Sequence, residues 1–402
     1  MPNDFCVSEN VKELIDGIIL NHSLDPTEDI KYALASESGD GYTSQAIAAT
    51  ITTSSGIHEL FLKCMLCITP TEAMPIDKAF ANEILFYDIV YPAYSKFLKD
   101  RDVVDGFRDA PKCYGTWQQN IIAMENLKKK GYRLFNCREE IMNEAYITMV
   151  LKSFAKFHAI SFAFKDQERE KYDKFVEKCH DLLHDEKGNS VIPKLFGGGI
   201  KDFLANLDPI EDGEILSRFK FEDLMASVST SRKTSDYLVL SKGDCWNNNM
   251  LFLYEDGNTK NPLDVMLIDW QLLYPASPVF DVSYIFLTAA SEEALSKTEG
   301  YLKLYYRELS RQIKQLGSNP DILYPFSIFL MEWKKYCKYG FAMGCLAIKV
   351  MLCSRDEAFN LAGLDPKDTE QCENPFPKFD NQEEYMKRMK RLARFMIDNS
   401  YI

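Results

Sequence analysis

Two aspartates and an asparagine, spaced along one stretch of the chain, have the residue types needed for phosphoryl transfer. Asp244 and Asn249 lie in the polar segment Gly-Asp-Cys-Trp-Asn-Asn-Asn at 243–249, and Asp269 closes the next apolar run. A loop between strands can aim Asp244 at a hydroxyl, while the amide oxygen of Asn249 and the carboxylate of Asp269 face a cation. Mg²⁺ prefers such oxygen ligands, together with substrate phosphates, and a base with two metal-facing oxygens is the minimum for this chemistry. Taken alone, the same spacing also fits a β-hairpin whose polar residues form turns.

Two charged residues upstream could complete such a site. Lys63 is the lysine of the run 58–65, which reads as a strand, and Glu83 lies in the segment 79–92, which reads as a helix. A lysine in this setting commonly extends its amine to solvent, and an unpaired Glu83 would be an ordinary solvated charge. If the two side chains pair, both become candidates for a functional role.

A glycine-containing segment at 37–44 precedes these residues. It includes Gly39, Gly41 and Ser44 and is followed by the alternating pattern of a strand. Glycine and small hydroxyl residues between strands let backbone N–H groups approach phosphates. A Gly-Asp-Gly turn can equally well just close a hairpin.

The remaining pattern predicts a short sheet region followed by helices. Apolar residues at Val11, Leu14, Ile15 and Ile18 have the helical period, and we expect a helix over 8–35. An apolar strand at 120–127 ends at a charged turn. We expect further helices at 139–164, 201–233, 291–316, 322–354 and 382–399. The aromatic residues of 326–341 are expected in the core, as apolar stripes normally are.

Composition restricts the class of protein. A chain of 402 residues suits two lobes rather than one small core. A net charge of −13 argues against a nucleic-acid or anionic-membrane binder, because those partners need clustered basic residues. The first ten residues do not have the basic and apolar segments expected of a signal peptide, and the late apolar stretch 341–352 is too short for a membrane span. We therefore expect a cytoplasmic monomer.

The cysteines and histidines do not suggest a metal site. The 11 cysteines are scattered, which predicts reduced thiols, and the Cys64-x-x-Cys67 pair has no second pair to complete a zinc site. His180 and His184, four apart on an expected helix, could bind zinc on one face. Without a third ligand, an exposed charged face is the better interpretation. His158 lies on an apolar helix face, which favours a core role.

Several motifs together resemble one family. The segment 243–249, followed by Leu-Ile-Asp-Trp-Gln at 267–271, resembles the catalytic and metal-binding loops of the ecdysteroid-kinase-like family. That family belongs to the choline-kinase and aminoglycoside-phosphotransferase group. The Phe-His-Ala helix at 157–159 and the Pro-x-x-Asp-x-x-Tyr helix start at 278–284 are similar as well. The resemblance covers roughly residues 30 to 350.

This resemblance implies an α/β, two-lobed protein-kinase-like fold. The N-lobe, 1–127, would be mostly sheet and end at the hinge, and the C-lobe, 128–402, would be largely helical, with ATP and Mg²⁺ between them. The implied activity is transfer of phosphate to a hydroxyl of an ecdysteroid or a similar apolar or xenobiotic alcohol. The implied roles are Asp244 as catalytic base, Asn249 and Asp269 as Mg²⁺ ligands, and Lys63, Glu83, Gly39, Gly41, Ser44, Met124, Glu125 and Leu127 as the ATP site.

Lys242 is the main departure from the family pattern, which has histidine at that position. We expect its stem to carry the charge out to solvent, which leaves a working but slowed kinase. The alternative is a catalytically weak or inactive nucleotide-binding protein on the same fold. In the hinge, Asn126 replaces the usual aspartate. Asp281, near a helix start, is expected to brace the catalytic loop.

Overall fold

The structure is a computed structural model. It describes residues 7–24, 27–35, 44–65, 75–184, 190–229, 234–255, 258–354, 357, 364, 367–374, 376 and 379–402. Gly39, Gly41 and Cys67, which figure in the sequence predictions, lie outside the described residues.

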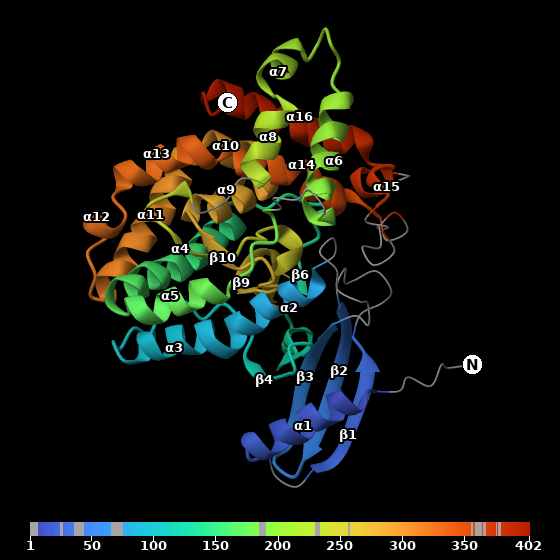
Figure 1. Cartoon of the computed structure of the whole chain (residues 1–402), viewed down its shortest axis with the longest axis vertical. Helices are drawn as coiled ribbons and strands as arrows, with labels where there is room; N and C mark the ends of the chain where they lie inside the picture. The colour runs from blue at the N-terminus through green and yellow to red at the C-terminus, as the bar shows by residue number, and fades with distance from the viewer. Residues whose placement is uncertain are drawn as a thin grey trace.

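The N-terminal part is a five-stranded antiparallel sheet covered on one face by a helix (Figure 1). The strand order is β1-β2-β3-β5-β4, and the bounds are β1 Thr27–Leu34, β2 Ser44–Thr53, β3 Gly56–Met65, β4 Cys113–Trp117 and β5 Ile121–Glu125. Helix α1, Glu9–Asn21, buries Val11, Leu14, Ile15 and Ile18 against the alternate inward residues of the sheet. This small core is separate from the main one and fixes the strand that carries Lys63.

The prediction of a helix over 8–35 was wrong in its second half. Residues 27–34 form β1, in which Ile30 pairs with Ile51 and Tyr32 with Ala49. The sequence contains the physical reason, because Pro26 removes a backbone donor and restricts its neighbour. The alternation of Ile30, Tyr32 and Leu34 after it has the period of a strand.

Three consecutive helical segments lead from the sheet to the larger lobe. They are α2, Ile76–Leu85, a π-helical turn, Phe86–Val90, and α3, Tyr91–Lys99. The inserted π turn follows Glu83 closely, and such turns are frequent at functional sites. Glu83 is buried on α2.

The rest of the chain is largely helical, with two small sheets where the candidate site lies (Figure 1). One sheet has the order β6-β8-β9 and the other pairs β7 with β10. The strands are β6 Arg133–Leu134, β7 Val239–Ser241, β8 Met250–Glu255, β9 Asn258–Leu267 and β10 Tyr274–Ala276. The helices are α4 Glu144–Gln167, α5 Arg169–Lys178, α6 Val191–Ala205, α7 Gly213–Arg218, α8 Phe221–Ser229, α9 Pro278–Ala289, α10 Glu292–Ser296, α11 Thr298–Gln315, α12 Pro320–Leu323, α13 Phe326–Tyr336, α14 Lys338–Leu352, α15 Thr369–Glu373 and α16 Gln382–Asp398.

Helix α4 is the central helix of this lobe. It is long and apolar enough to cross a membrane by length and composition, but 78% of its apolar window is buried within the protein, as expected of a core helix. Most of the aromatic residues predicted to lie in the core do so. Phe329, Trp333, Tyr339 and Phe341 are buried. The fold prediction is confirmed: the chain has the protein-kinase-like fold, an N-terminal antiparallel sheet followed by a largely helical region.

Candidate active site

Lys63 connects the sheet to two distant carboxylates. Its Nζ donates to Oε2 of Glu83 at 2.6 Å and to Oδ1 of Asp269 at 2.8 Å. Burial opposes the charged amine, but the carboxylates of Asp269 and Glu83 raise the pKa of Lys63 above its ordinary value. The lysine therefore does not extend to solvent. It is a charged group held at the junction of β3, α2 and the segment after β9.

Asp244 and Asn249 lie side by side in the loop between β7 and β8. The Asn249 Nδ2 donates to Asp244 Oδ2 at 2.7 Å, and the backbone turns through a 3₁₀ segment at Asn247–Asn249. Burial raises the pKa of Asp244 to about 6, and the nearby Asp269 raises it too, while Lys242 and Asn249 act in the opposite direction. A carboxylate with a raised pKa is a better proton acceptor, which suits a general base.

Asp281 holds the backbone that precedes Asp244. At the start of α9, its carboxylate accepts the N–H groups of Lys242 at 2.7 Å and Gly243 at 2.9 Å, and the hydroxyl of Ser241 at 2.5 Å. Although burial alone would raise the pKa of Asp281, His158 and these donors lower it to about 2. The ionised carboxylate thus braces the loop, the role expected for it.

His158 completes this brace from α4. It is fully buried, with Nε2 3.1 Å from Asp281 Oδ2 and Nδ1 2.8 Å from the hydroxyl of Tyr305. Both ring nitrogens therefore have partners within the core. This agrees with the core role expected from its apolar helix face.

The expectation that Lys242 points to solvent was wrong. The residue is 0% exposed, and its Nζ donates to the backbone carbonyls of Asp244 at 2.6 Å and Asp269 at 2.9 Å. The physical reason is that the loop between β7 and β8 and the segment after β9 each supply one carbonyl acceptor at the end of the lysine stem. A buried ammonium is tolerated when its donors are used in this way.

Asn82 is a site-region residue that we did not identify from the sequence. Its side chain is fully buried; Nδ2 donates to the carbonyls of His180 and Gln271, both at 2.9 Å, and Oδ1 accepts the N–H of His180 at 2.8 Å. Asn82 therefore fixes α2, with the adjacent Glu83, to the segment that follows Asp269. The only signal in the sequence was an amide on the apolar side of an expected helix.

Trp270, directly after Asp269, supports the same junction by packing. Its ring is fully buried and stacks on Phe86 of the π turn with centroids 3.6 Å apart. The indole Nε1 donates to the carbonyl of Leu267 at 3.2 Å. The π turn and the segment after β9 are thus packed together directly.

The expected hinge follows β5. The backbone N–H of Glu125 donates to the carbonyl of Lys112 at 2.9 Å, so it is already used within the sheet region. Asn126 Oδ1 accepts the N–H of Lys129 and so caps the 3₁₀ turn that begins at Leu127. An aspartate at 126 would accept the same hydrogen bond, so this departure from the family pattern preserves the local geometry.

The other predicted nucleotide residues that the structure describes lie on, or directly after, the two strands beside β3. Ser44 begins β2 opposite Met65 at the end of β3, and Met124 is buried in β5 opposite Phe61. Leu127 is buried against Tyr132 and Leu251. Gly39 and Gly41 fall in the part of the chain that the structure does not describe, so their roles stay predictions.

The two histidines considered for zinc do not lie on a helix, contrary to the prediction. Helix α5 ends at Lys178, and the Nδ1 of His184 is 2.7 Å from the carbonyl of Ser229. Among the described residues, no group of three or more His, Cys, Asp or Glu side chains gathers as a metal site. A zinc site at these histidines has no support.

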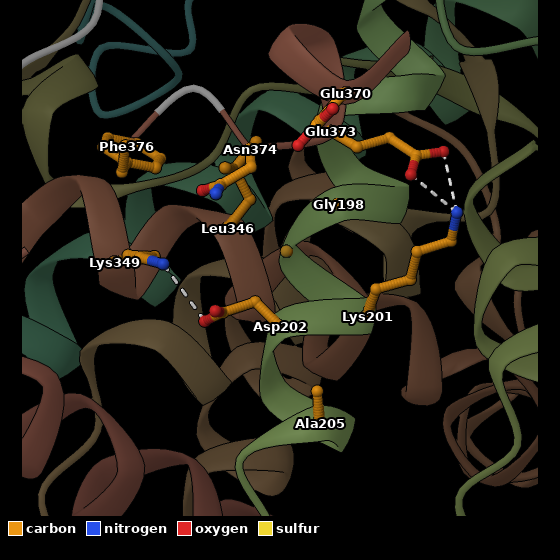
Figure 2. A pocket seen from close by; sticks show the side chains of 11 residues that line it. Gly198, Lys201, Asp202, Ala205, Leu346, Lys349, Glu370, Glu373, Asn374 and Phe376 are labelled. Atoms are coloured by element: carbon orange, nitrogen blue, oxygen red, sulfur yellow. Dashed lines mark hydrogen bonds and ion pairs between the residues drawn. The ribbon is translucent and has the colours of Figure 1, made fainter. Parts of the chain in front are cut away.

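A separate pocket of about 260 Å³ lies between α6, α14 and α15 (Figure 2). Two ion pairs form its charged walls: Lys349 with Asp202 at 3.1 Å, and Lys201 with Glu373 at 2.7 Å. Of the predicted site residues that the structure describes, none lines this pocket. The pocket is therefore distinct from the cluster around Lys63 and Asp244.

Comparison with known proteins decides the family. The profile of the ecdysteroid kinase-like family matches residues 38–318, which include the segments carrying Lys63, Asp244 and Asp269. The chain belongs to the ecdysteroid kinase-like family. This ecdysteroid kinase-like protein is accordingly a small-molecule kinase. No curated protein matches its sequence significantly.

Solved structures similar to this ecdysteroid kinase-like protein are distant. Plasmodium vivax ethanolamine kinase is 15% identical with a TM-score of 0.45, covering 98% of this chain and 92% of its own. The GDP complex of a point mutant of aminoglycoside 2'-phosphotransferase-IIIa is 11% identical with a TM-score of 0.42, covering 98% and 99%. Type VIII aminoglycoside-3'-phosphotransferase is 13% identical with a TM-score of 0.33, covering 77% and 100%.

Proposed function

We propose that the protein is an ATP- and Mg²⁺-dependent kinase that phosphorylates a hydroxyl of an ecdysteroid or a similar apolar or xenobiotic alcohol. The observation that carries this proposal is the ion-pair bridge of Lys63 to Glu83 and Asp269. A lysine held in this way presents a fixed positive charge for nucleotide phosphates, and the glutamate keeps it oriented.

Asp244 is the proposed base. Its carboxylate would accept the proton of the substrate hydroxyl as the oxygen attacks the terminal phosphate. The hydrogen bond from Asn249 fixes the direction of that carboxylate. With a pKa raised to about 6 by burial and by Asp269, Asp244 is ionised at neutral pH yet more basic than an exposed aspartate.

The side chains at the site fit a divalent cation. Asp244 and Asp269 are close enough for their charges to repel, and a divalent cation held by Asp269 would reduce that repulsion. With its nitrogen on Asp244, Asn249 has the carbonyl end of its amide to offer a metal. Mg²⁺, when bound by Asn249 and Asp269, would neutralise charge on the phosphates.

The second candidate is an inactive nucleotide-binding protein, suggested by lysine at position 242. The interactions of Lys242 favour an enzyme instead, because its amine donates to two backbone carbonyls and leaves the carboxylates of Asp244 and Asp269 for other partners. We further propose a cytoplasmic monomer without nucleic-acid or membrane partners. The net charge of −13 and buried thiols such as Cys245 and Cys345 support this setting.

The proposed function is tested by incubating the protein with ATP, Mg²⁺ and a panel of hydroxylated steroids, phenols and aliphatic alcohols. Mass spectrometry should detect a product that has gained one phosphoryl group. In parallel, ATP should raise the melting temperature, because a ligand that binds only the folded state stabilises it. Stabilisation by ATP without any product across the panel would favour the inactive binding protein.

A further inference from the structure

Lys242 lies where the catalytic loop, residues 243–249, meets the metal-binding loop, residues 267–271. Its backbone N–H is held by Asp281 Oδ2 at 2.7 Å, and its Nζ reaches the carbonyls of Asp244 and Asp269. Both ends of the residue are therefore fixed. The side chain is 0% exposed, so the amine cannot exchange these carbonyls for solvent without a rearrangement.

The backbone at Asp269 is unusual. Its φ of +64° lies in the left-handed region, which is uncommon for residues other than glycine. Such a conformation persists only where surrounding contacts impose it. The hydrogen bond from Lys242 to the Asp269 carbonyl is one such contact. In this conformation, Oδ1 of Asp269 reaches Lys63 at 2.8 Å.

We propose that Lys242 is a positioning residue that fastens the catalytic loop to the metal-binding loop. Its ammonium joins the backbone of Asp244 to that of Asp269, which fixes the two carboxylates relative to each other and maintains the left-handed turn at Asp269. The inference rests on the proposed function, because it assigns these two loops to base and metal. It goes beyond that function because it assigns a role to a residue that is proposed to contact neither substrate nor metal.

Lysine is suited to this task by its donors. An ammonium has three N–H donors, whereas a neutral imidazole has one. A histidine at 242 would therefore bond one of the two carbonyls and leave the other without its donor. The lysine can thus replace the family's histidine and makes one hydrogen bond more than a neutral histidine could, to a second backbone carbonyl. The Trp270 ring, whose centroid is 5.7 Å from Nζ, adds a favourable contact with the cation.

The test compares wild type with Lys242→Met, which keeps the length of the stem but removes the donors, and Lys242→Gln, which restores amide donors without charge. Lys349→Met is the matched control, since Lys349 is also buried (5% exposed) but bonds Asp202 beside the separate pocket (Figure 2). Two quantities are measured for each protein: the melting temperature with ATP over a Mg²⁺ series, and kcat at saturating ATP.

We expect Lys242→Met to raise the Mg²⁺ midpoint of the ATP-induced stabilisation at least tenfold and to lower kcat. The stabilisation by ATP without Mg²⁺ should be retained. Lys242→Gln should recover part of the loss. The control should lower the basal melting temperature alone, with an unchanged Mg²⁺ midpoint. A purely structural role for Lys242 predicts that its variants behave like the control.

A wild-type Mg²⁺ midpoint in folded Lys242→Met would overturn the inference. If that variant does not fold, Lys242→His decides, because it should raise the midpoint about threefold or more; an unchanged midpoint contradicts the proposed connection. These failures differ from failure of the proposed function. In that case the wild type itself would show no Mg²⁺-dependent stabilisation and no product, and both proposals would fall together.

Discussion

The carboxylate of Asp281 lies under the catalytic loop, with its Oδ2 3.1 Å from Nε2 of the fully buried His158. This contact joins the helix start after β10 to the central helix α4. The same carboxylate accepts the N–H groups of Lys242 and Gly243. These hydrogen bonds hold the catalytic loop in a fixed position on the core. The position of Asp244 therefore depends on side chains of the buried core.

Stability should depend on the ionisation of Asp281. Its folded-state pKa of about 2 lies below the ordinary 3.8, so its contribution is fully present well above pH 3.8 and is lost as the pH falls toward 2. Asp281→Asn should be less stable than wild type at pH 6, and the difference should be about 1 kcal/mol smaller at pH 3. Urea unfolding at the two pH values measures this.

The control for that experiment is Asp173→Asn, whose carboxylate pairs with Arg169 on the exposed side of α5. It should change stability little at either pH. A destabilisation by Asp281→Asn that is the same at pH 6 and pH 3 would show that its carboxylate is not held ionised by the loop.

Lys63→Met should raise the KM for ATP and lower kcat together. The substitution removes the fixed charge from the phosphates and leaves the carboxylates of Glu83 and Asp269 without their shared cation. Loss of one such preorganised group typically costs roughly 10² or more in rate. Steady-state kinetics test this, with Lys31→Met as control because Lys31 lies on β1 with an exposed side chain. Unchanged kinetics in Lys63→Met would remove the lysine from the phosphate site.

Asn82→Ala should destabilise the protein and impair nucleotide use. It removes three buried hydrogen bonds that join α2 to the segments at His180 and Gln271, at a cost of about 3 kcal/mol. The ATP KM should rise, since Glu83 follows on the same helix. Asn206→Ala is the control, because within the described residues the Asn206 side chain donates to Asp202 at the end of the same helix. Equal stability losses in the two variants would contradict this assignment.

The sequence predicted the charged residues of the site better than the contacts that hold them. Lys63, Glu83 and Asp269 could be proposed because the order of their segments along the chain resembles that of the family, and the structure brings the three together. The burial of Lys242 and the role of Asn82 could not be predicted. Both depend on backbone carbonyls supplied by other segments, whose positions exist only after tertiary packing.

The strand at 27–34 was missed for a different reason. Apolar and polar residues alternate in this strand, but the apolar residues before it have a helical period. Only a few residues around Pro26 separate the two patterns. Strand pairing with β2 decides the outcome there. Local period is a weak guide where a helix and a strand are separated by only a few residues.

Asp244 is the proposed base in phosphoryl transfer to a small-molecule hydroxyl. The most direct measurement is mass spectrometric detection of phosphorylated product from ATP, Mg²⁺ and the alcohol panel, for wild type and Asp244→Asn side by side. We expect product with wild type, a loss of about 10² to 10⁴ in rate for Asp244→Asn, and ATP-induced stabilisation of both proteins. Product formation by Asp244→Asn at the wild-type rate, or ATP binding by the wild type with no product from any alcohol, would contradict this expectation.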